Sequence, residues 1–244
     1  MKILSIDTAS DVCGVAILEN DKLVYSLDTN TGRTHSENLM PMIQNAFNKT
    51  NLTLNDIKLI VCDIGPGSFT GIRIGVATSK AFHDSLQIPC IGISSLESLA
   101  YNFIEKSANS KYICSIIDSK NNNCYFALYE LNNNCIQTLI EPQAETIEDT
   151  LSILKSYCED TLEENISLIF AGDGSDIYKD KIIKTFSHSN FANAEDNVLN
   201  SYSLGLAGLY KYNLGLEFEE VLPLYLKKPQ AQRLFEEKEK NNTI

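Results

Sequence analysis

Long apolar stretches are missing from this sequence of 244 residues. No segment approaches the roughly eighteen consecutive apolar residues that a membrane-spanning helix needs. The N-terminal run MKILSIDTAS is short and carries Asp7, so it resembles neither a signal-peptide core nor a membrane anchor. The sequence therefore predicts a chain that is neither exported nor inserted into a membrane, and we expect it in the cytoplasm.

Paired cysteines and an excess of basic residues are also missing. The seven cysteines are scattered, form no CxxC pair and mostly lie in apolar, strand-like runs, which predicts reduced, buried side chains rather than zinc ligands or disulfides. Lys and Arg total 20 against 32 Asp and Glu, a net charge of -12. Because phosphate contacts depend on basic residues, we expect any RNA to be held mainly by another component.

The order of apolar runs predicts an α/β protein of two related lobes. Residues 2–8, 12–18 and 23–28 read as a strand meander, and strand 58–64, the loop GPGSFTG, a helix and strand 90–93 read as a βαβ crossover. Two strands around the turn SKNNN and a third at 136–141 repeat the meander. The loop SANSK marks the boundary, so we predict lobes at 1–108 and 109–244, the second with a charged tail.

Capping residues and helical spacing predict where the helices lie. A helix over 34–50 begins with a Thr34–Glu37 capping box, and Pro41 predicts a kink or a late start. Ser68 or Thr70 caps the second helix, and Ser94 or Ser95 caps a third that ends near 108. Further helices are predicted over 147–157 and 178–186, the latter after a loop GDGS, and from the cap Ser201 to Gly215. The tail after Pro229 is interpreted as a frayed helix or disorder.

Asp7, Thr8 and Ser10 lie in a tight turn between the first two strands. In the actin, Hsp70 and sugar-kinase superfamily, which this pattern resembles, such a turn directs N–H groups and an Asp toward nucleotide phosphates and their magnesium. An Asp after an apolar strand is also an ordinary turn residue. Both interpretations stay open.

Gly65, Pro66 and Gly67 open the loop GPGSFTG. The helix behind this loop offers unpaired N–H groups to an anion, or the glycines serve a tight strand-to-helix connection. The loop is not a Walker motif, because no Lys follows its last glycine.

A second histidine is missing from the first helix. His35 begins that helix, but Leu39 stands four residues on, where a helical metal site needs another His. His83 and His188 fit no ligand spacing, and no nucleophile elbow, Ser–His arrangement or paired-carboxylate motif is found. The sequence predicts neither a metal site nor a catalytic centre.

The first two helices carry apolar and small-residue stripes. The first stripe comprises Leu39, Met42, Ile43, Ala46 and Phe47. The second helix has Gly71, Gly75 and Ser79 four residues apart and a separate apolar face at Ile74, Ala77, Ala81 and Phe82. These stripes either cover the sheet of their own lobe or, because the second helix has two usable faces, also present a surface to a partner.

The segments ILSIDTAS, HSENLMPMI, DIGPGSFTGIRIGVATSKAF and PLYLKKP together resemble the TsaB (YeaZ) family over essentially the whole chain. The resemblance implies an actin/Hsp70/sugar-kinase-like (ASKHA) fold of two related lobes, each a mixed sheet with helices. It also implies a non-catalytic subunit of threonylcarbamoyl transfer to tRNA. Metal and catalysis belong to the paralogue TsaD, which has a second His where Leu39 stands here.

The same resemblance implies pairing with TsaD through the first two helices, an ATPase partner TsaE, and a homodimer through the same surface when TsaD is absent. ATP and metal would belong to the partners, tRNA would bind only through the complex, and no cofactor would be held tightly by this chain. The partner interface carried onto this sequence comprises His35, Leu39, Met42, Ile43, Phe47, Arg73, Gly75, Ser79 and Phe82. Asp118, Ser119 and Lys120 stand where the family commonly has Asp, Ala and Arg, followed by Tyr125.

Our hypothesis is therefore a non-catalytic protein that binds and activates TsaD. One alternative is an independent kinase or ATPase of the same fold that uses Asp7 and the glycine loop at 65–67. A second alternative is a metallopeptidase, which would need tightly bound zinc or iron.

Overall fold

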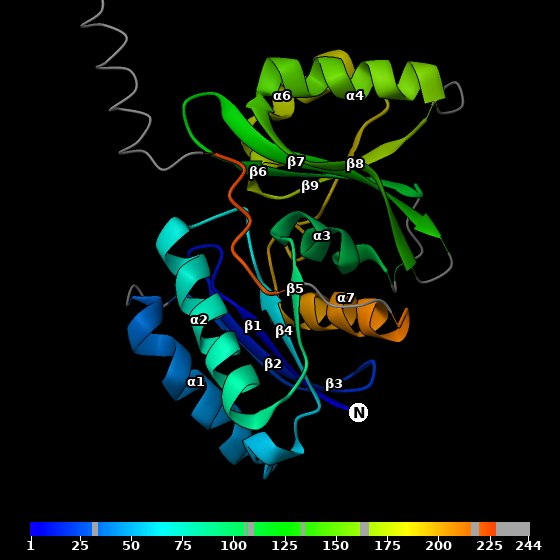
Figure 1. Ribbon diagram of the computed structural model, residues 1–244. Coiled ribbons are helices and arrows are strands. Elements are labelled where there is room, and N and C mark those ends of the chain that lie inside the picture. The colour runs from blue at the N-terminus through cyan, green and yellow to red at the C-terminus, as the bar shows by residue number, and fades with distance from the viewer. Residues whose placement is uncertain are drawn as a thin grey trace, which may run out of the picture.

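The structure is a computed structural model that describes residues 1–30, 34–104, 106, 110–132, 135–161, 166–215 and 220–227. The described chain forms two five-stranded mixed sheets, one above the other in Figure 1. The first sheet has the order β3-β2-β1-β4-β5, and the second has the order β10-β9-β6-β7-β8. The strands of the first sheet are β1 (Lys2–Asp7), β2 (Cys13–Glu19), β3 (Lys22–Thr29), β4 (Leu59–Asp63) and β5 (Cys90–Ile93). Those of the second are β6 (Tyr112–Asp118), β7 (Asn123–Asn132), β8 (Cys135–Thr146), β9 (Leu168–Ala171) and β10 (Asn190–Phe191).

Both sheets repeat one topology. The central strand β1 is antiparallel to β2 and parallel to β4, which is parallel to β5. In the second sheet β6 is antiparallel to β7 and parallel to β9, which is parallel to β10. The central strands are apolar on both faces because helices cover both sides of each sheet. The predicted repeated meander and the predicted βαβ crossover are confirmed.

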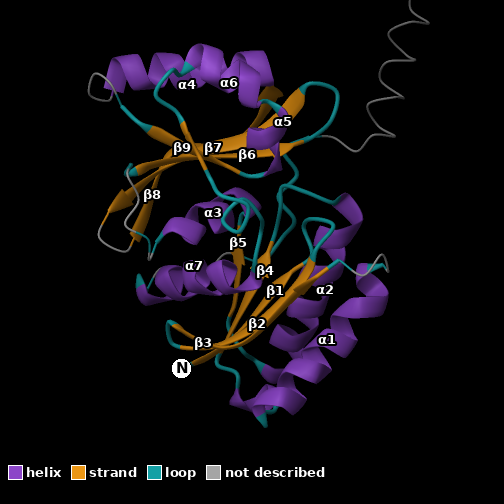
Figure 2. Ribbon diagram, turned by 180° about the vertical axis from the view of Figure 1, so that it is seen from behind, coloured by secondary structure: helices purple, strands orange, loops and turns teal. Residues whose placement is uncertain are grey.

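Helices cover the sheets in layers. The α-helices are α1 (His35–Thr50), α2 (Phe69–Leu86), α3 (Ser95–Ala100), α4 (Ile147–Thr161), α5 (Asp173–Ile177), α6 (Lys179–Thr185) and α7 (Ser201–Asn213), and the 3-10 helices are η1 (Leu54–Asp56) and η2 (Tyr101–Phe103). Helices α1 and α2 lie side by side on one face of the first sheet, with α7 on the other, as Figure 2 shows from behind. Helices α4 and α6 lie on the outer face of the second sheet.

The predicted lobe boundary separates the strands of the two sheets but not their helices. Helix α7, placed by sequence in the lobe 109–244, packs on the first sheet, and α3, placed in the lobe 1–108, packs on β6 and β7. A Cβ atom on Gly205 or Gly208 would collide with Leu18 or Val61, so these glycines let α7 lie close to the first sheet. The assignment of α7 to the second lobe was wrong, because the periodicity of a helix does not say which sheet it covers.

Local signals predicted several helix starts. The Thr34 amide donates to the Glu37 carboxylate at 3.1 Å, which confirms the capping box, and α1 begins at His35 despite Pro41, so the late start is wrong. Ser68 caps α2 and Ser94 caps α3 through their hydroxyls. The cap of α7 is Asn200 rather than Ser201, since its amide oxygen accepts from the Ser203 amide at 2.8 Å.

Other predicted boundaries differ from the structure. Helix α3 ends at Ala100 instead of near 108 and continues as η2, and the predicted loop GDGS forms the start of α5. Strand β8 is longer than predicted, and α4 runs four residues further. The predicted boundary loop SANSK lies partly, and the tail after Pro229 wholly, outside the described residues.

The cysteines mostly occupy core positions. Cys13, Cys62, Cys90, Cys114 and Cys124 are buried, and Cys135 and Cys158 are half-buried, all as free thiols. The prediction of reduced, largely buried cysteines is confirmed for these five. No helix in the described part of the chain is long and apolar enough to cross a membrane.

Candidate functional site

The β1–β2 turn and the glycine loop are in direct contact. The Ser68 amide donates to the Ala9 carbonyl at 2.6 Å, and the Thr8 hydroxyl donates to the Gly71 carbonyl at 2.8 Å. A Cβ atom on Gly67 would collide with the Ala9 carbonyl oxygen, and one on Gly71 with that of Thr8. The glycines therefore allow a close backbone approach, as the tight-connection interpretation of the loop expects.

Two buried carboxylates lie beneath this contact. Asp7 and Asp63 follow the paired residues Ile6 and Cys62 at the ends of adjacent parallel strands, and both are at most 2% exposed. Asp63 Oδ1 accepts from the Gly65 amide and the Ser95 hydroxyl, both at 2.7 Å, whereas its Oδ2 has no hydrogen-bond partner. Burial raises the pKa of Asp63 to about 7, and burial together with the charge of Asp63 raises the pKa of Asp7.

A cleft of about 490 Å³ opens between the two lobes. The first lobe contributes the β1–β2 turn and the glycine loop, including Ser10, Pro66 and Gly67, and the second contributes the end of β6 and the start of α5. Asp7, Thr8 and Gly65 do not line this cleft. Three of the six residues predicted for nucleotide or phosphate binding therefore face it, and three are used inside the first lobe.

Charged side chains at the cleft are mostly acidic. Asp11, Asp118, Asp173 and Lys120 line it. Burial would raise the pKa of Asp118, but hydrogen bonds from the Tyr178 hydroxyl at 2.7 Å and from Lys120 outweigh this effect and lower it. The Lys120 ammonium lies 3.0 Å from the Asp118 carboxylate. A lining with three carboxylates and one paired lysine offers little attraction to a phosphate.

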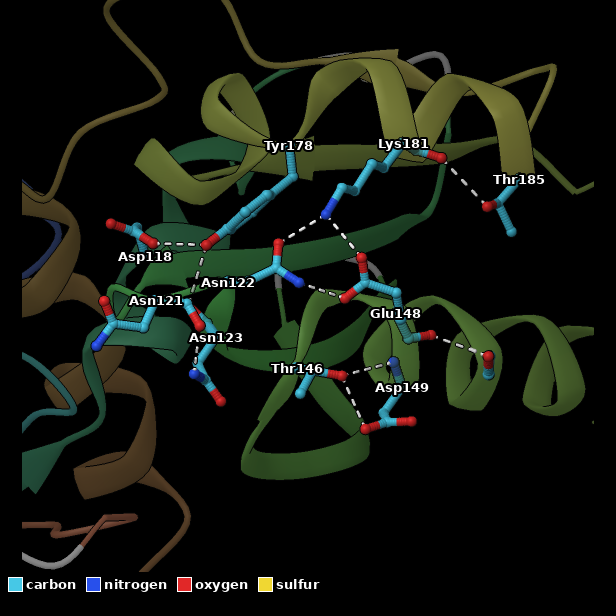
Figure 3. A network of polar contacts seen from close by, with 11 residues as sticks. Asp118, Asn121, Asn122, Asn123, Thr146, Glu148, Asp149, Tyr178, Lys181 and Thr185 are labelled. Atoms are coloured by element: carbon cyan, nitrogen blue, oxygen red, sulfur yellow. Dashed lines mark hydrogen bonds and ion pairs between the residues drawn. The ribbon is translucent and has the colours of Figure 1, made fainter. Parts of the chain in front are cut away.

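The turn that carries Lys120 is fixed by its own polar network. Lys120, Asn121 and Asn122 all have positive φ, which Asn tolerates better than most residues. Asn122 and Lys181 both bond Glu148, and Tyr178 links Asp118 to the Asn123 carbonyl (Figure 3). The network holds the β6–β7 turn, which lines the cleft, against α4 and α6.

The apolar stripe of α1 is buried within the chain. Leu39, Met42, Ile43 and Phe47 are between 1% and 9% exposed and pack in the core of the first lobe. Gly75 and Ser79 of α2 are also buried, and a Cβ atom on Gly75 would collide with the Thr8 hydroxyl. These six residues cover their own sheet, because their stripes are the faces that the sheet itself requires. Their placement in a partner interface stays a prediction.

Other residues form the outer face of α1 and α2. Met40 is 51% exposed, Arg73, Ala77 and Ala81 are exposed, and Ile74 and Phe82 are half-buried at its edge. A groove of about 390 Å³ beside the helices is lined by Met40, Gln44 and Phe82, among others, and also by the predicted interface residues Ile43 and Phe47. The predicted second apolar face of α2 is thus accessible at Ala77 and Ala81. Of the predicted interface residues, Arg73 is exposed and His35 and Phe82 are half-buried.

His35 serves a contact within the first lobe. Its Nε2 lies 2.8 Å from the Ser10 carbonyl, and its ring packs against Gly71, while Leu39 points into the core. Among the described residues, no group of three or more His, Cys, Asp and Glu is arranged to hold a metal ion.

A C-terminal segment that sequence reasoning did not assign to the site lies against α2. Residues 220–227 cross from the core of the first lobe to the β6–β7 turn of the second, where the Lys227 ammonium donates to the Ser119 hydroxyl at 2.6 Å. The motif PLYLKKP lies partly in this segment, but nothing in its pattern indicates which helix it contacts.

Two lobes of one repeated topology, with a cleft between the ends of their central strands, define a protein of the ASKHA fold. A ROK hexokinase from Thermus thermophilus has a TM-score of 0.52 at 10% identity, over 87% of this chain and 100% of that chain. YeaZ from Pseudomonas aeruginosa has a TM-score of 0.74 at 20% identity, over 92% of this chain and 99% of that chain. Both likenesses show the fold.

Sequence comparison adds the family. The chain matches the family model described as "TsaD: tRNA N6-adenosine threonylcarbamoyltransferase" over residues 28–234. A tRNA threonylcarbamoyladenosine biosynthesis protein TsaB from Bacillus subtilis is 30% identical over 246 residues, 98% of this chain and 100% of that protein. The chain belongs to the TsaB (YeaZ) family.

Proposed function

We propose that this chain acts in the synthesis of threonylcarbamoyladenosine in tRNA, in the cytoplasm, as a non-catalytic subunit that binds and activates TsaD. The observation that carries the proposal is the outer face of α1 and α2, where Met40, Ala77 and Ala81 stay exposed although the cores beneath are complete. The name of the Bacillus relative supports the pathway.

The first helix supports a non-catalytic role. His35 is engaged with the Ser10 carbonyl, and the next position on its face is Leu39, which is buried. A helix that offers one imidazole supplies too few ligands for a catalytic metal. In this proposal metal and ATP belong to TsaD and the ATPase TsaE, and tRNA is bound through the assembled complex.

The outer face suits a helical partner. Ala77 and Ala81 are small, so a partner helix can approach α2 closely, and Met40 can adapt its shape to a partner across α1. The partner's two corresponding helices would complete a four-helix contact, and a second copy of this chain would use the same face when TsaD is absent. Activation then follows if docking stabilises the active arrangement of TsaD.

The test is the affinity of the purified chain for TsaD from the same organism, measured by calorimetry alongside transfer activity. Ala77→Arg or Ala81→Arg should weaken binding tenfold or more, a loss of about 1.4 kcal/mol. Ala194→Arg, an exposed alanine before α7, is the matched control and should bind as the wild type does. Transfer activity that is the same with and without this chain would contradict the proposal.

Nucleotide binding in the interlobe cleft is the second candidate, favoured by the cleft itself and by Ser10, Pro66 and Gly67 in its wall. Calorimetry of the isolated chain with ATP and magnesium tests it. Micromolar binding would support an independent kinase or ATPase.

A further inference from the structure

The C-terminal strap, residues 220–227, is fastened to the first lobe on one side of α2. Val221 is 6% exposed in the core, and the Leu224 amide donates to the Ile64 carbonyl at 2.7 Å, directly before the glycine loop. Glu220 pairs with Lys80 of α2. The strap therefore runs beside the outer face of α2 rather than leaving the molecule.

Tyr225 of the strap and Phe69 of α2 form a stack that includes Arg73. The two ring centroids lie 4.8 Å apart, and the Arg73 guanidinium carbon lies 3.8 Å from the centroid of Phe69. The Arg73 Nε donates to the Tyr225 hydroxyl at 2.7 Å. One ring and one hydroxyl thus fix the plane of the guanidinium. Arg73 has therefore already lost much of the rotamer freedom that an unrestrained arginine side chain has.

The fixed guanidinium keeps two unused donor groups. Arg73 is exposed, and its two terminal nitrogens have no hydrogen-bond partner within the described ranges. The nearby Lys80 is neutralised by Glu220. In a chain of net charge -12, Arg73 is therefore a defined positive point next to Ala77 on the outer face of α2.

We propose that Arg73, positioned by Tyr225, binds a carboxylate that the partner presents to the outer face of α2. The proposal rests on the proposed function and adds the chemistry of one contact: an Asp or Glu side chain of the partner, held by the planar guanidinium. The terminal nitrogens of an arginine match the two oxygens of a carboxylate, a geometry that a lysine ammonium does not provide. Preorganisation by the stack lowers the entropy cost of forming the pair.

Binding of TsaD to the full-length chain, measured at low and high salt, tests the proposal. Arg73→Ala should weaken binding about tenfold and remove much of its salt dependence, because an exposed ion pair is screened by salt. Arg73→Lys should recover only part of the loss. Tyr225→Phe keeps the stacked ring but loses the hydroxyl, so its effect should be smaller than that of Tyr225→Ala.

Two controls separate the possible failures. Lys155→Ala removes one positive charge on the outer face of the second lobe and should bind as the wild type does, and melting temperatures check that each variant is folded. If Ala77→Arg abolishes binding while Arg73→Ala and Tyr225→Phe bind like the wild type at both salt concentrations, the carboxylate contact is wrong and the partner surface stands. Absence of wild-type binding overturns both.

Discussion

Asp7 and Asp63 end adjacent strands of the first sheet, and burial is the main cause that raises the pKa of both. Two buried carboxylates without a counter-charge repel each other when both are ionised, so the native pair retains a proton to higher pH than the unfolded chain does. Asp63 also fixes the start of the glycine loop and the start of α3 through one oxygen. Its second oxygen, Oδ2, has no hydrogen-bond partner. Replacing the carboxylate with the neutral amide of asparagine would avoid a buried charge at this position.

The pH dependence of stability follows from this pair. The native pKa of Asp63 is about 7 and its ordinary value is 3.8, so its contribution to stability is fully present below about pH 4 and is lost as pH rises toward 7. Asp63→Asn removes this loss, since a neutral amide does not ionise in the buried site. We expect it to be more stable than the wild type by on the order of 1 to 3 kcal/mol at pH 7.5, with little gain at pH 4.5.

Urea unfolding of both proteins at the two pH values measures the effect. Asp84→Asn, which changes an exposed aspartate on α2, is the control, and its stability should depend on pH as that of the wild type does. Equal gains for Asp63→Asn at both pH values would contradict the raised pKa of Asp63.

At the scale of elements, the contact between α2 and the β1–β2 turn decides how the first lobe is built. The sequence shows a glycine loop before a helix, which is compatible with an anion site and with close packing. The structure shows the packing: Thr8 and Ala9 approach the loop and the first turn of α2 through backbone and hydroxyl hydrogen bonds. The small residues on this face of α2 are therefore needed for the close packing of the helix within its own lobe.

Gly71→Ala tests this requirement. In a helix interior, replacing Gly with Ala ordinarily stabilises by up to about 1 kcal/mol. Here the new Cβ would meet the Thr8 carbonyl oxygen, a backbone atom that cannot rotate away, and would lie 2.9 Å from the His35 ring. We therefore expect the sign to reverse, with a loss of about 1–3 kcal/mol in the free energy of unfolding. Ser85→Ala, exposed on the same helix, is the control and should change stability little.

At the scale of the whole molecule, the crossing that leads to the second sheet is joined to the crossing that leads back to α7 by side chains of Asn102 and Lys106, the latter paired with Asp196. Asn102 of η2 lies at the crossing that leads to the second sheet, and its amide nitrogen donates to the carbonyls of Asp196 and Val198, each at 2.9 Å, on the crossing that returns. Its amide oxygen accepts from Asn200, the cap of α7, at 2.7 Å. Through these crossings the chain places α3 against the second sheet and α7 against the first.

Asn102→Ala should therefore destabilise both lobes together. Three hydrogen bonds at a site only 8% exposed would be lost, and the carbonyl of the buried Asp196 would lose this donor, so we expect about 2–4 kcal/mol. Thermal unfolding followed by both circular dichroism and tyrosine fluorescence measures the loss, and the two probes should still coincide. Asn55→Ala, at an exposed position in η1, provides the comparison. Separate transitions in the wild type would show that the lobes unfold independently.

The sequence predicted most strands, the βαβ crossover and several caps because these depend on neighbours within a few residues. Thr34 with Glu37, and Ser68 before α2, are examples. It did not predict that α7 covers the first sheet, that Asn200 rather than Ser201 caps α7, or that residues 220–227 lie along α2. Each of these contacts joins residues far apart in the chain or depends on competition between adjacent candidates, and local periodicity carries no information on either.

Local sequence by itself determined the repeated succession of strands along the chain and the small-residue face of α2, because hydrophobic spacing and glycine positions act over short distances. Only the tertiary structure decided which stripe stayed on the surface. The apolar residues Leu39, Met42, Ile43 and Phe47 of α1 are largely buried against the sheet, whereas Met40 on the same helix is exposed. What remains outside is a set of smaller or less apolar side chains around Arg73, Ala77 and Ala81, whose accessibility follows from how the sheet, α2 and the strap pack.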